Sequence, residues 1–432
     1  MKKINRRKLL KTALPATVAA YALPTLIPST VFGANDRLRV AVLGVNGRGK
    51  SHIAGFMNLD NVEVATLCDP DQNVLDQRAS DFQKKYDKKV SLEQDLRKVY
   101  EDKTIDAVSI ATPNHWHSLA AIWAMQAGKD VYVEKPACHT IYEGQQLVKA
   151  AKKYKRIVQH GVQLRSSEAM QEAIQHLRDG LIGRVYMARG TVYKWRPSIG
   201  DQGTSAVPAG LDWNLWQGPA QERAFSKNYV HYNWHWFWDY GNGDIGNQGI
   251  HETDLAMWGL DVGLPEEITS AGGKYLWDDC KETPELLTST YNYPSEGKVI
   301  EFEVRPWMTN LEDGVGVGNL FYGDKGYMVI NGYNDYKTFL GRDREPGPAR
   351  KAGGDHYKNF VEAVRAQDYS LLNGPIETGY KSSALAHLGN IAYRLGRKLD
   401  FDPKTETFKG DAEANAMLKQ EYRTPFVVPE IV

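Results

Sequence analysis

Short apolar segments alternate with segments of helical periodicity between residues 37 and 159, and no other feature restricts the fold as much. Successive parallel strands need a crossover connection, and a helix is the usual crossover. The apolar segments predict strands at Arg39–Leu43, Val62–Cys68, Ala107–Ala111, Asp130–Glu134 and Arg156–Gln159, with helices near 49–58, 71–84, 116–127 and 143–153. We therefore expect a doubly wound parallel sheet with crossover helices.

The pattern changes after Gly161. A helix is predicted near 168–178, and the strands of a largely antiparallel open sheet are predicted near 183–193, 267–274, 288–293, 298–304 and 327–330. Two further helices, near 356–366 and 378–395, are expected to pack back onto the body. The expected α/β chain thus has three parts: a leader (1–34), a Rossmann dinucleotide-binding domain (35–160) and a C-terminal α+β substrate domain (161–432).

The first residues have the pattern of an export signal. Arg6 and Arg7 precede an apolar stretch over 13–27, which is typical of the twin-arginine type. Prolines interrupt the stretch, so it is shorter than the roughly 20 uninterrupted apolar residues of a spanning helix. We expect cleavage near Gly33 or Ala34 and a periplasmic protein, with an uncleaved leader acting as an anchor as the alternative.

The charge balance and the cysteines exclude several classes of partner. Lys+Arg and Asp+Glu both total 53, so no charge excess favours nucleic acid or an anionic membrane. The three cysteines have no close pair, which indicates neither a disulfide framework nor a zinc site. A small molecule is therefore the expected partner, and no metal is expected.

The first predicted strand runs into a glycine loop. Gly44 and Gly49 occupy the first and last positions of a dinucleotide-binding fingerprint, in which glycines allow a tight turn and a close approach to a pyrophosphate. Asn46 replaces the middle glycine, with Gly47 beside it, and asparagine tolerates unusual backbone angles. The predicted phosphate-binding residues are Gly44, Asn46, Gly47, Arg48 and Gly49.

The second predicted strand is followed by Asp69, at the position of a ribose-binding carboxylate. A carboxylate there accepts hydrogen bonds from ribose hydroxyls and repels a 2′-phosphate, so NAD is favoured over NADP. Arg48 is an observation against this preference for NAD, because a nearby guanidinium can neutralise a 2′-phosphate, although it can also simply stack on adenine. The structural alternative for Asp69 is a cap on the helix that begins near Asp71.

Polar clusters follow two further predicted strands. One reads Thr112-Pro113-Asn114-His115-Trp116-His117 and the other Glu134-Lys135-Pro136. Ligands of open parallel sheets bind beyond the carboxyl ends of the strands, so both clusters are expected at one cofactor cleft. Together with the glycine loop and a later histidine segment, these motifs resemble the Gfo/Idh/MocA oxidoreductases over nearly the whole chain after the leader.

The resemblance implies a nicotinamide site and oligomers. The residues that would line the nicotinamide half of the cleft are Thr112, Pro113, Asn114, His117, Glu134 and Lys135. The bond before Pro136 would be cis and would aim the lysine. The alternative interpretation, without a functional role, is that Glu134 and Lys135 form an ordinary surface ion pair.

The histidine segment lies between residues 241 and 254. The family pattern has an aspartate four residues before the histidine, whereas this chain has Asn247 before His251. Residues four apart share a helix face, but asparagine cannot titrate, which leaves Lys135 and His251 as the candidate acid–base groups. His251 could instead be a hydrogen-bonded packing residue. The predicted substrate-binding residues are Arg165, Tyr193, Trp236, Asn247, His251 and Asp254.

Aromatic residues are dense between Trp195 and Trp238. Flat aromatic faces suit the apolar faces of sugar rings, so this loop is interpreted as part of a carbohydrate cleft. Loop packing or a subunit interface is an equally strong alternative. Metal ligation by His231 and His235 is disfavoured, because no cysteine lies near them.

Three functions are compatible with these residues. The first is an NAD-dependent oxidoreductase that takes hydride from a secondary alcohol of a sugar, with Lys135 as base and the cofactor retained. The second is a redox-neutral glycoside hydrolase, because relatives in the family look like NAD-dependent N-acetylgalactosaminidases. The third, a dinucleotide-bound sensor or scaffold, is disfavoured by the presence of both Lys135 and His251.

Overall fold

A computed structural model describes residues 37–307 and 310–432. The predicted twin-arginine leader and its cleavage site lie outside the described residues. Residues from Leu38 to Val432 belong to one contact unit, so contacts between the two sheets described below are internal to it.

The first sheet has six parallel strands in the order β3-β2-β1-β4-β5-β6 among the described residues. This order is the doubly wound arrangement expected from the alternating sequence pattern. The strands are β1 (Leu38–Leu43), β2 (Val62–Cys68), β3 (Ser91–Glu93), β4 (Ala107–Ile110), β5 (Asp130–Glu134) and β6 (Val158–Gly161). The crossover helices are α1 (Gly49–Met57), α2 (Gln72–Tyr86), α3 (Leu96–Glu101), α4 (Asn114–Gln126) and α5 (Ile141–Tyr154).

Apolar side chains cover both faces of this sheet, as the nearly continuous hydrophobic runs of its strands require. On one face, α1 and α2 pack with α10 (His356–Ala366), through side chains that include Phe56, Leu75 and Phe360. On the other face, α3, α4 and α5 enclose a second apolar layer. The carboxyl ends of β1, β4 and β5 stay open for a ligand between these layers.

The second sheet has ten strands among the described residues, in the order β14-β13-β12-β11-β7-β10-β9-β8-β15-β16. Its pairs are antiparallel except for β7 with β10. The strands are β7 (Val185–Tyr193), β8 (Glu267–Gly273), β9 (Leu286–Tyr293), β10 (Lys298–Arg305), β11 (Val317–Gly323), β12 (Gly326–Asn331), β13 (Asp335–Leu340), β14 (Glu345–Lys351), β15 (Leu399–Asp402) and β16 (Thr407–Phe408). The fold class predicted from the sequence is confirmed.

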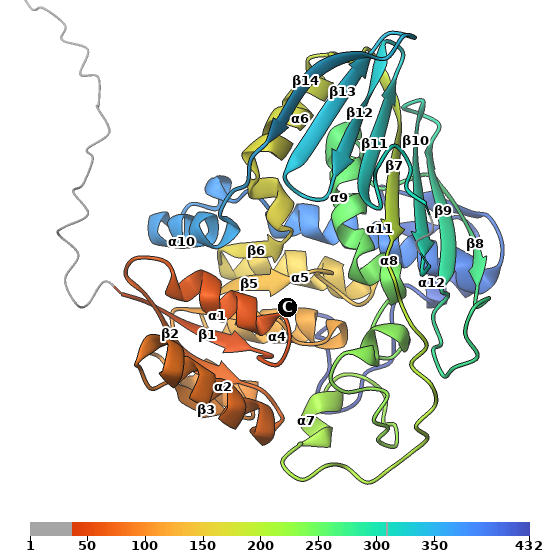
Figure 1. The fold of residues 1–432 in the computed structure, drawn as a ribbon. Coiled ribbons are helices and arrows are strands. Elements are labelled where there is room, and N and C mark those ends of the chain that lie inside the picture. The colour runs from red at the N-terminus through yellow and green to blue at the C-terminus, as the bar shows by residue number, and fades with distance from the viewer. Residues whose placement is uncertain (1–36, 308–309) are drawn as a thin grey trace, which may run out of the picture. The chain divides into compact units, whose positions relative to one another are not determined.

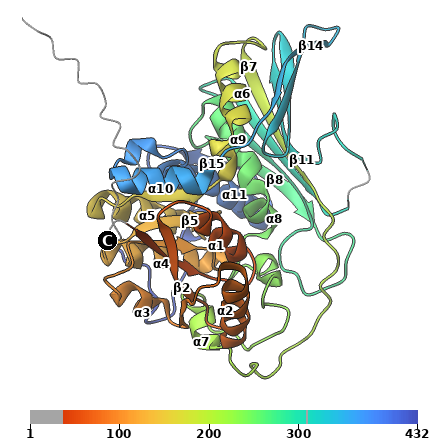
Figure 2. The ribbon, with the colours of Figure 1, turned by 60° about the vertical axis from the view of Figure 1, so that its left-hand side comes forward.

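Helices lie on one face of the second sheet, and no described helix covers its other face (Figures 1 and 2). The covering helices are α6 (Glu168–Arg178), α9 (Gly249–Leu260) and α11 (Ile376–Leu395). Shorter helices, η2 (Gln163–Ser166), α7 (Trp213–Gln217), η3 (Asn233–Trp236), α8 (Gly243–Asn247), η4 (Tyr369–Leu371) and α12 (Ala412–Ala416), connect the larger elements. Helix α8 brings the second half of the chain against the open end of the first sheet (Figure 1).

The segment after α12 returns to the first sheet. Phe426 and Val428 are buried in the apolar layer beneath α4, and the ring of Phe426 lies 5.5 Å from that of Trp116. Tyr422 donates a hydrogen bond to the buried Glu143 of α5. Residues far apart in the sequence therefore complete one core.

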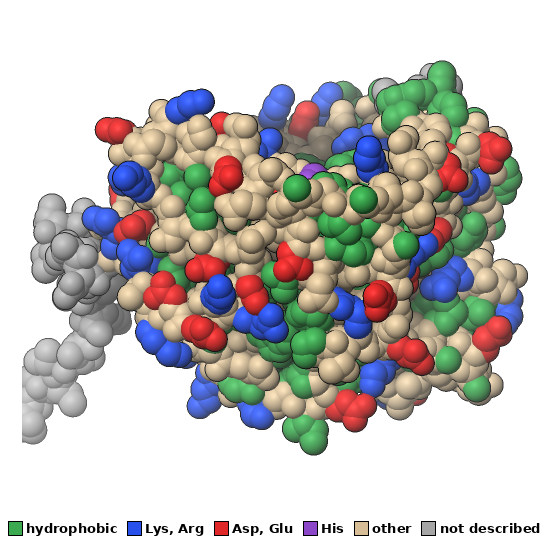
Figure 3. All heavy atoms as spheres, turned by 90° about the horizontal axis from the view of Figure 1, so that it is seen from below, with side chains coloured by type: hydrophobic (Ala, Val, Ile, Leu, Met, Phe, Trp, Pro, Cys, Tyr) green, Lys and Arg blue, Asp and Glu red, His purple; other side chains and the backbone are tan. Residues whose placement is uncertain are grey.

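The surface seen in Figure 3 carries interspersed acidic and basic side chains without a large field of one sign. This mixed surface agrees with the equal totals of basic and acidic residues. Over the part of the chain that the structure describes, no helix is both long and apolar enough to cross a membrane.

Several observed elements have no counterpart among the predicted ones. The strands β3, β11, β13, β14, β15 and β16 and the helix α3 were not predicted. Strand β3 has three residues and β16 two, which is too short for a period to be read, and β14 carries two prolines and exposed side chains. The long predicted elements were found within a few residues of their expected bounds.

The start of α9 must approach the second sheet closely, which leads to a first prediction. A Cβ atom at Gly249 would lie 2.4 Å from Cζ of the buried Phe302. We expect Gly249→Ala to lower the free energy of unfolding by about 1–3 kcal/mol through overpacking. Urea unfolding followed by fluorescence measures the change. Gly263→Ala is the matched control, because its Cβ would meet nothing within 4 Å, and equal midpoints for the two variants would contradict the predicted contact.

Candidate active site

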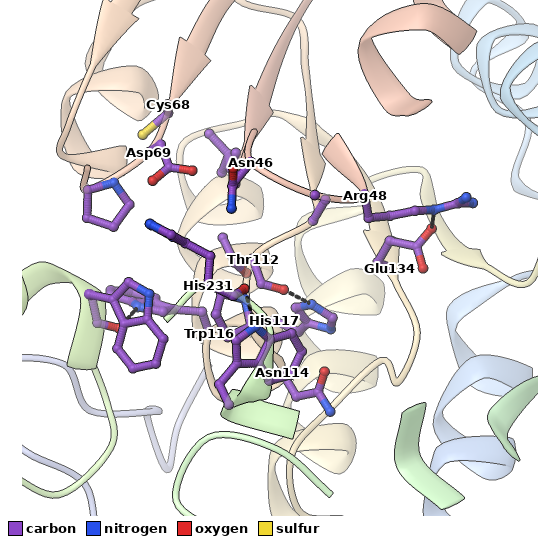
Figure 4. A pocket seen from close by; sticks show the side chains of 18 of the residues that line it. Asn46, Arg48, Cys68, Asp69, Thr112, Asn114, Trp116, His117, Glu134 and His231 are labelled. Carbon is purple, nitrogen blue, oxygen red and sulfur yellow. Dashed lines mark hydrogen bonds and ion pairs between the residues drawn. The ribbon is translucent and has the colours of Figure 1, made fainter. Parts of the chain in front are cut away.

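A cavity of about 510 Å³ lies at the carboxyl ends of β1, β4 and β5. Its volume is within the usual range of small-molecule and cofactor sites, roughly 300–1,000 Å³. The predicted cofactor residues that line it are Gly44, Asn46, Gly47, Arg48, Asp69, Thr112, Pro113, Asn114, His117, Glu134 and Lys135. Figure 4 shows Asn46 between Asp69 on one side and Arg48 with Glu134 on the other. The remaining predicted residue, Gly49, is outside the lining.

The glycine loop is closed by two tight backbone approaches. Gly44 has a φ of +79°, and a Cβ there would lie 2.7 Å from the carbonyl oxygen of Ala111, the residue after β4. At Gly49 a Cβ would lie 2.1 Å from the carbonyl oxygen of Gly44. Gly49 therefore shapes the loop rather than the cavity wall. At Gly47, by contrast, the position of a Cβ is open, which leaves room beside the loop for a ligand.

Asp69 lies at the end of β2 and faces the cavity (Figure 4). Its two carboxylate oxygens accept hydrogen bonds from the N–H groups of Val45 (2.9 Å) and Asp71 (3.1 Å). Burial raises the pKa of Asp69 to about 6, although these two donors oppose the shift. The cap of α2 is Asp71, which accepts from the N–H of Asn73, and Asp69 is not that cap.

Arg48 contacts Glu134 across the cavity from Asp69. The Nε–Oε1 distance is 2.8 Å, and the pair links the glycine loop to the end of β5 (Figure 4). Burial alone would raise the pKa of Glu134, but Arg48, His52 and Lys135 together outweigh burial and hold the pKa well below its usual value. Arg48 therefore neutralises a buried carboxylate.

Three further donors fix the same carboxylate. His52 Nε2 lies 3.1 Å and Gln163 Nε2 lies 3.0 Å from Oε1, and the backbone N–H of Lys135 donates to Oε2. Burial lowers the pKa of His52, so the neutral ring donates to Glu134 and accepts from the Ser109 hydroxyl (2.7 Å). These donors and Arg48 together fix the Glu134 carboxylate and leave it little capacity to accept hydrogen bonds from a ligand.

Lys135 points to the second half of the chain. Its Nζ donates to the backbone oxygen (2.9 Å) and to Oδ1 (3.0 Å) of Asn247, the last residue of α8. Burial lowers the pKa of Lys135 more than the charge of Glu134 raises it. The amine thus lies in the cavity wall beside two neutral oxygens.

His251 lies one helical turn after Asn247, on α9. Its ring packs against Tyr333 with a centroid distance of 4.8 Å. Burial, followed by the charge of Lys135, lowers the pKa of His251 to about 3, so the ring is neutral near pH 7. Within the described residues its Nδ1 is buried without a hydrogen-bond partner.

Of the predicted substrate residues, Asn247 lines the cavity, whereas His251 is buried behind the lining and the remaining four also lie outside it. Arg165 and Asp254 form a buried two-point ion pair with distances of 2.7 and 3.0 Å, which ties η2 to α9. Tyr193 donates to Glu303 on the second sheet. Trp236 packs under the guanidinium of Arg196.

A segment over residues 208–235, which we call the strap, forms the wall opposite the glycine loop. It leaves the second half of the chain and crosses the end of β2. There the N–H of Gln72 donates to Gly210 O (2.9 Å), the N–H of Asp212 donates to Pro70 O (2.9 Å), and His231 Nε2 lies 3.1 Å from Asp71 Oδ2. The strap residues in the cavity lining are Leu215, Trp216, His231, Tyr232, Trp234 and His235.

The aromatic residues of this region form one apolar cluster, part of which also lines the cavity. Trp213, Phe225 and Tyr229 of the strap pack against Phe237 and Tyr240, which follow it in the chain. Trp216 and Trp234 belong to the same cluster and also line the cavity. Loop packing therefore accounts for much of the aromatic density, and a smaller set faces the ligand space.

Sequence reasoning missed two donors to Glu134. His52 follows Arg48 by four residues on α1, so helical spacing already placed both on one face. Gln163 carries no sequence signal, because it reaches the carboxylate only after the chain turns beyond β6. Tyr333 comes from the turn after β12, and no sequence pattern indicated that it would pack against His251.

Two family profiles match the chain. One, described as an oxidoreductase family with an NAD-binding Rossmann fold, matches residues 38–162. The other, the C-terminal alpha/beta domain of the oxidoreductase family, matches residues 170–272 and 346–428. The chain belongs to the Gfo/Idh/MocA oxidoreductase family. As in other Rossmann folds, its cavity lies at the strand ends where a dinucleotide binds.

Curated relatives of this chain include glycosidases. A glycosyl hydrolase family 109 protein of Shewanella pealeana is 31% identical over 205 residues, 42% of this chain and 44% of that protein. An alpha-N-acetylgalactosaminidase of Shewanella oneidensis is 32% identical over 154 residues, 34% of this chain and 33% of the relative. The chain thus spans less than half the length of these relatives.

Solved structures share the fold of this chain. The WlbA dehydrogenase of Bordetella pertussis, in complex with NADH and UDP-GlcNAcA, has a TM-score of 0.63 at 20% identity, over 85% of this chain and 99% of that one. The aldose-aldose oxidoreductase of Caulobacter crescentus, complexed with glycerol, has a TM-score of 0.62 at 18% identity, over 84% and 100%.

The two loop glycines give a second prediction. Gly44→Ala adds left-handed strain of about 1–2 kcal/mol to a backbone clash, so we expect it to destabilise the cofactor-free protein. Gly47→Ala has no such clash, so it should leave that stability unchanged and weaken NAD binding alone. Thermal unfolding without cofactor and NAD calorimetry measure the two effects. A stable Gly44→Ala protein would contradict the loop geometry.

Proposed function

We propose that the protein is an NAD-dependent oxidoreductase that takes hydride from a secondary alcohol of a sugar or sugar derivative and keeps its cofactor bound. The observation that carries this proposal is the half-buried Lys135 amine in the cavity wall, beside two neutral acceptors. When bound, the nicotinamide ring supplies the hydride acceptor. The chain must supply binding groups for the cofactor and a base for the hydroxyl proton.

The lining of the cavity fits NAD. The open space beside Gly47 suits a pyrophosphate, and the Asp69 carboxylate suits the adenine-side ribose hydroxyls. The same carboxylate repels a 2′-phosphate. Arg48, the nearby cation that could have compensated, is bound to Glu134. These contacts favour NAD over NADP.

Lys135 is the proposed base. Burial favours its uncharged form, and Arg48 reduces the attraction that the Glu134 carboxylate would otherwise exert on the ammonium. Asn247 holds the amine in place without adding a negative charge. His251, which is neutral and has an unpartnered ring nitrogen, is the proposed partner for a second substrate hydroxyl.

The strap supports retention of the cofactor. It covers the cavity on the side of Asp69 and is held by backbone hydrogen bonds at the end of β2. We propose that the strap slows the release of a bound dinucleotide. We also propose that residues 1–34 export the folded protein, and a retained cofactor suits a compartment that lacks free NAD.

Redox-neutral glycoside hydrolysis is the second candidate, favoured by the family 109 relatives and by the strap. In that reaction a ring hydroxyl is oxidised and the neighbouring C–H, now acidic, loses its proton. The glycosidic substituent then leaves, water adds to the double bond, and the same hydride returns to the oxidised carbon. Lys135 and His251 are the proposed groups for the proton transfers.

The two reactions are distinguished by incubating the purified protein with a panel of glycosides and no added cofactor. Release of the aglycone without net reduced nicotinamide supports hydrolysis. Reduced nicotinamide, at most one equivalent per bound cofactor, supports the dehydrogenase. No change in either readout, with the nucleotide verified as bound by mass spectrometry, would reject both for that panel and support a binding protein.

Removing the Lys135 amine gives a third prediction. We expect Lys135→Met to lower turnover by about 10²- to 10⁴-fold, the usual contribution of a general base, and to leave the bound nucleotide unchanged. Substrate assays and nucleotide extraction measure the two quantities. Lys84→Met, an exposed lysine on α2, is the control. Wild-type turnover in Lys135→Met would remove this lysine from the mechanism.

Asn247 gives a fourth prediction. A carboxylate beside the amine favours its charged form, so we expect Asn247→Asp to raise the pKa of Lys135. If turnover needs the uncharged amine, the acid limb of the pH–rate profile should move to higher pH by about 1–3 units. Asn247→Ser, which adds no charge, should leave the limb in place. An unchanged limb in Asn247→Asp would contradict the role of Lys135 as base.

A further inference from the structure

Three tryptophans lie together at the surface outside the cavity. The rings of Trp195 and Trp307 are 4.5 Å apart at 73°, and those of Trp195 and Trp277 are 5.8 Å apart at 87°. Trp195 and Trp307 are 50% and 48% exposed. Single exposed apolar residues are ordinary, but a cluster of large aromatic rings in water indicates a binding surface.

The backbone fixes this cluster. Trp195 follows β7 and Trp307 follows β10. Because these two strands pair in parallel, the two segments leave the sheet at the same end of the strands. The pairing continues past the strands, because the N–H of Lys194 donates to Arg305 O and the N–H of Arg196 donates to Pro306 O. The indole of Trp277 donates to Arg196 O (2.9 Å). The rings therefore form a prepared surface.

Polar contacts connect the tryptophans to the candidate active site. Arg196 forms a two-point ion pair with Asp244 of α8 and donates to the hydroxyl of Tyr232, which lines the cavity. On the other side, Lys194 Nζ lies 3.4 Å from Oε1 of Gln248, the residue after Asn247. The cluster is thus continuous with the edge of the cavity that holds Lys135.

The chemistry of this surface suits a sugar ring. Rings that meet near a right angle present flat faces to two sides of a ligand, and the C–H faces of a pyranose match such walls. Hydroxyl groups at the ring edge need hydrogen-bonding partners, and the exposed Lys194 lies beside the tryptophans, whereas Arg196 is already bound to Asp244 and Tyr232. Tryptophan is also enriched at protein–protein interfaces, so a contact between copies is the other occupant that an experiment must separate from a sugar.

We propose that Trp195, Trp277 and Trp307 bind a second sugar unit of the substrate, next to the unit whose alcohol reacts at Lys135. This inference rests on the proposed function and specifies it. The substrate is an oligosaccharide or the end of a glycan chain, and a free monosaccharide occupies only the inner part of the site.

Binding tests the inference without turnover. Wild-type protein, with the cofactor that purifies with it, is screened on an array of defined oligosaccharides. The strongest ligand and the methyl glycoside of its terminal sugar are then compared by calorimetry. We expect the oligosaccharide to bind at least about tenfold more tightly than the methyl glycoside, because it reaches both parts of the site.

Variants locate the second sugar. The double variant Trp195→Ala/Trp307→Ala should lose that tenfold advantage and keep its affinity for the methyl glycoside. Tyr369→Ala, which removes an exposed aromatic ring on η4, is the matched control and should behave as wild type. Circular dichroism and nucleotide content verify the fold of each variant.

Several results would overturn the inference. These are equal affinity of the wild type for both ligands, an equal loss for both ligands in the double variant, or no array binding at all. A change in sedimentation of the double variant with unchanged sugar affinity would identify the surface as a contact between copies. Failure of the proposed function is read separately, as absence of turnover in a protein that still distinguishes the two sugars.

Discussion

The buried Glu134 carboxylate is the contact on which the rest of the candidate site depends. Arg48 of the glycine loop, His52 of α1, Gln163 of η2 and the backbone of Lys135 all donate to it. Loss of the partner of a buried charge costs about 3–5 kcal/mol, so these groups cannot shift independently. One carboxylate thus fixes the glycine loop, the lysine and the start of the second half relative to one another.

The charges around Lys135 follow from the same arrangement. Glu134 is adjacent to the lysine in sequence and would by itself stabilise an ammonium. Arg48 reduces that effect, and the residue that accepts hydrogen bonds from the amine is an asparagine where the family pattern has an aspartate. The site therefore fixes the position of the lysine amine, while its pKa stays below the usual value for lysine.

Sequence reasoning succeeded where a local pattern carries the physical requirement. The parallel sheet followed from alternating apolar and helical segments, and motifs at strand ends predicted eleven of the residues that line the cavity. It failed where a contact depends on distant chain segments. Arg48 was weighed as a partner for the cofactor, but the structure pairs it with Glu134, 86 positions away. Arg165 and Asp254 were assigned to the substrate, although they bind each other.

The strap and the tryptophan surface lay beyond sequence patterns for the same reason. The aromatic residues between 195 and 238 have no period, so composition alone could not separate those that pack together from those that face a ligand. That division depends on how the strap crosses β2 and how β7 pairs with β10.

The return of residues 422–428 to the first sheet affects how the chain folds. The apolar layer under α4 includes Phe426 and Val428, which the ribosome adds some 300 residues after that helix, a separation that follows from their positions in the sequence. During synthesis, part of the hydrophobic surface around the first sheet therefore stays uncovered until these residues have been added. At roughly 5–20 residues per second this interval lasts some tens of seconds, long enough for chaperones to bind the unfinished chain.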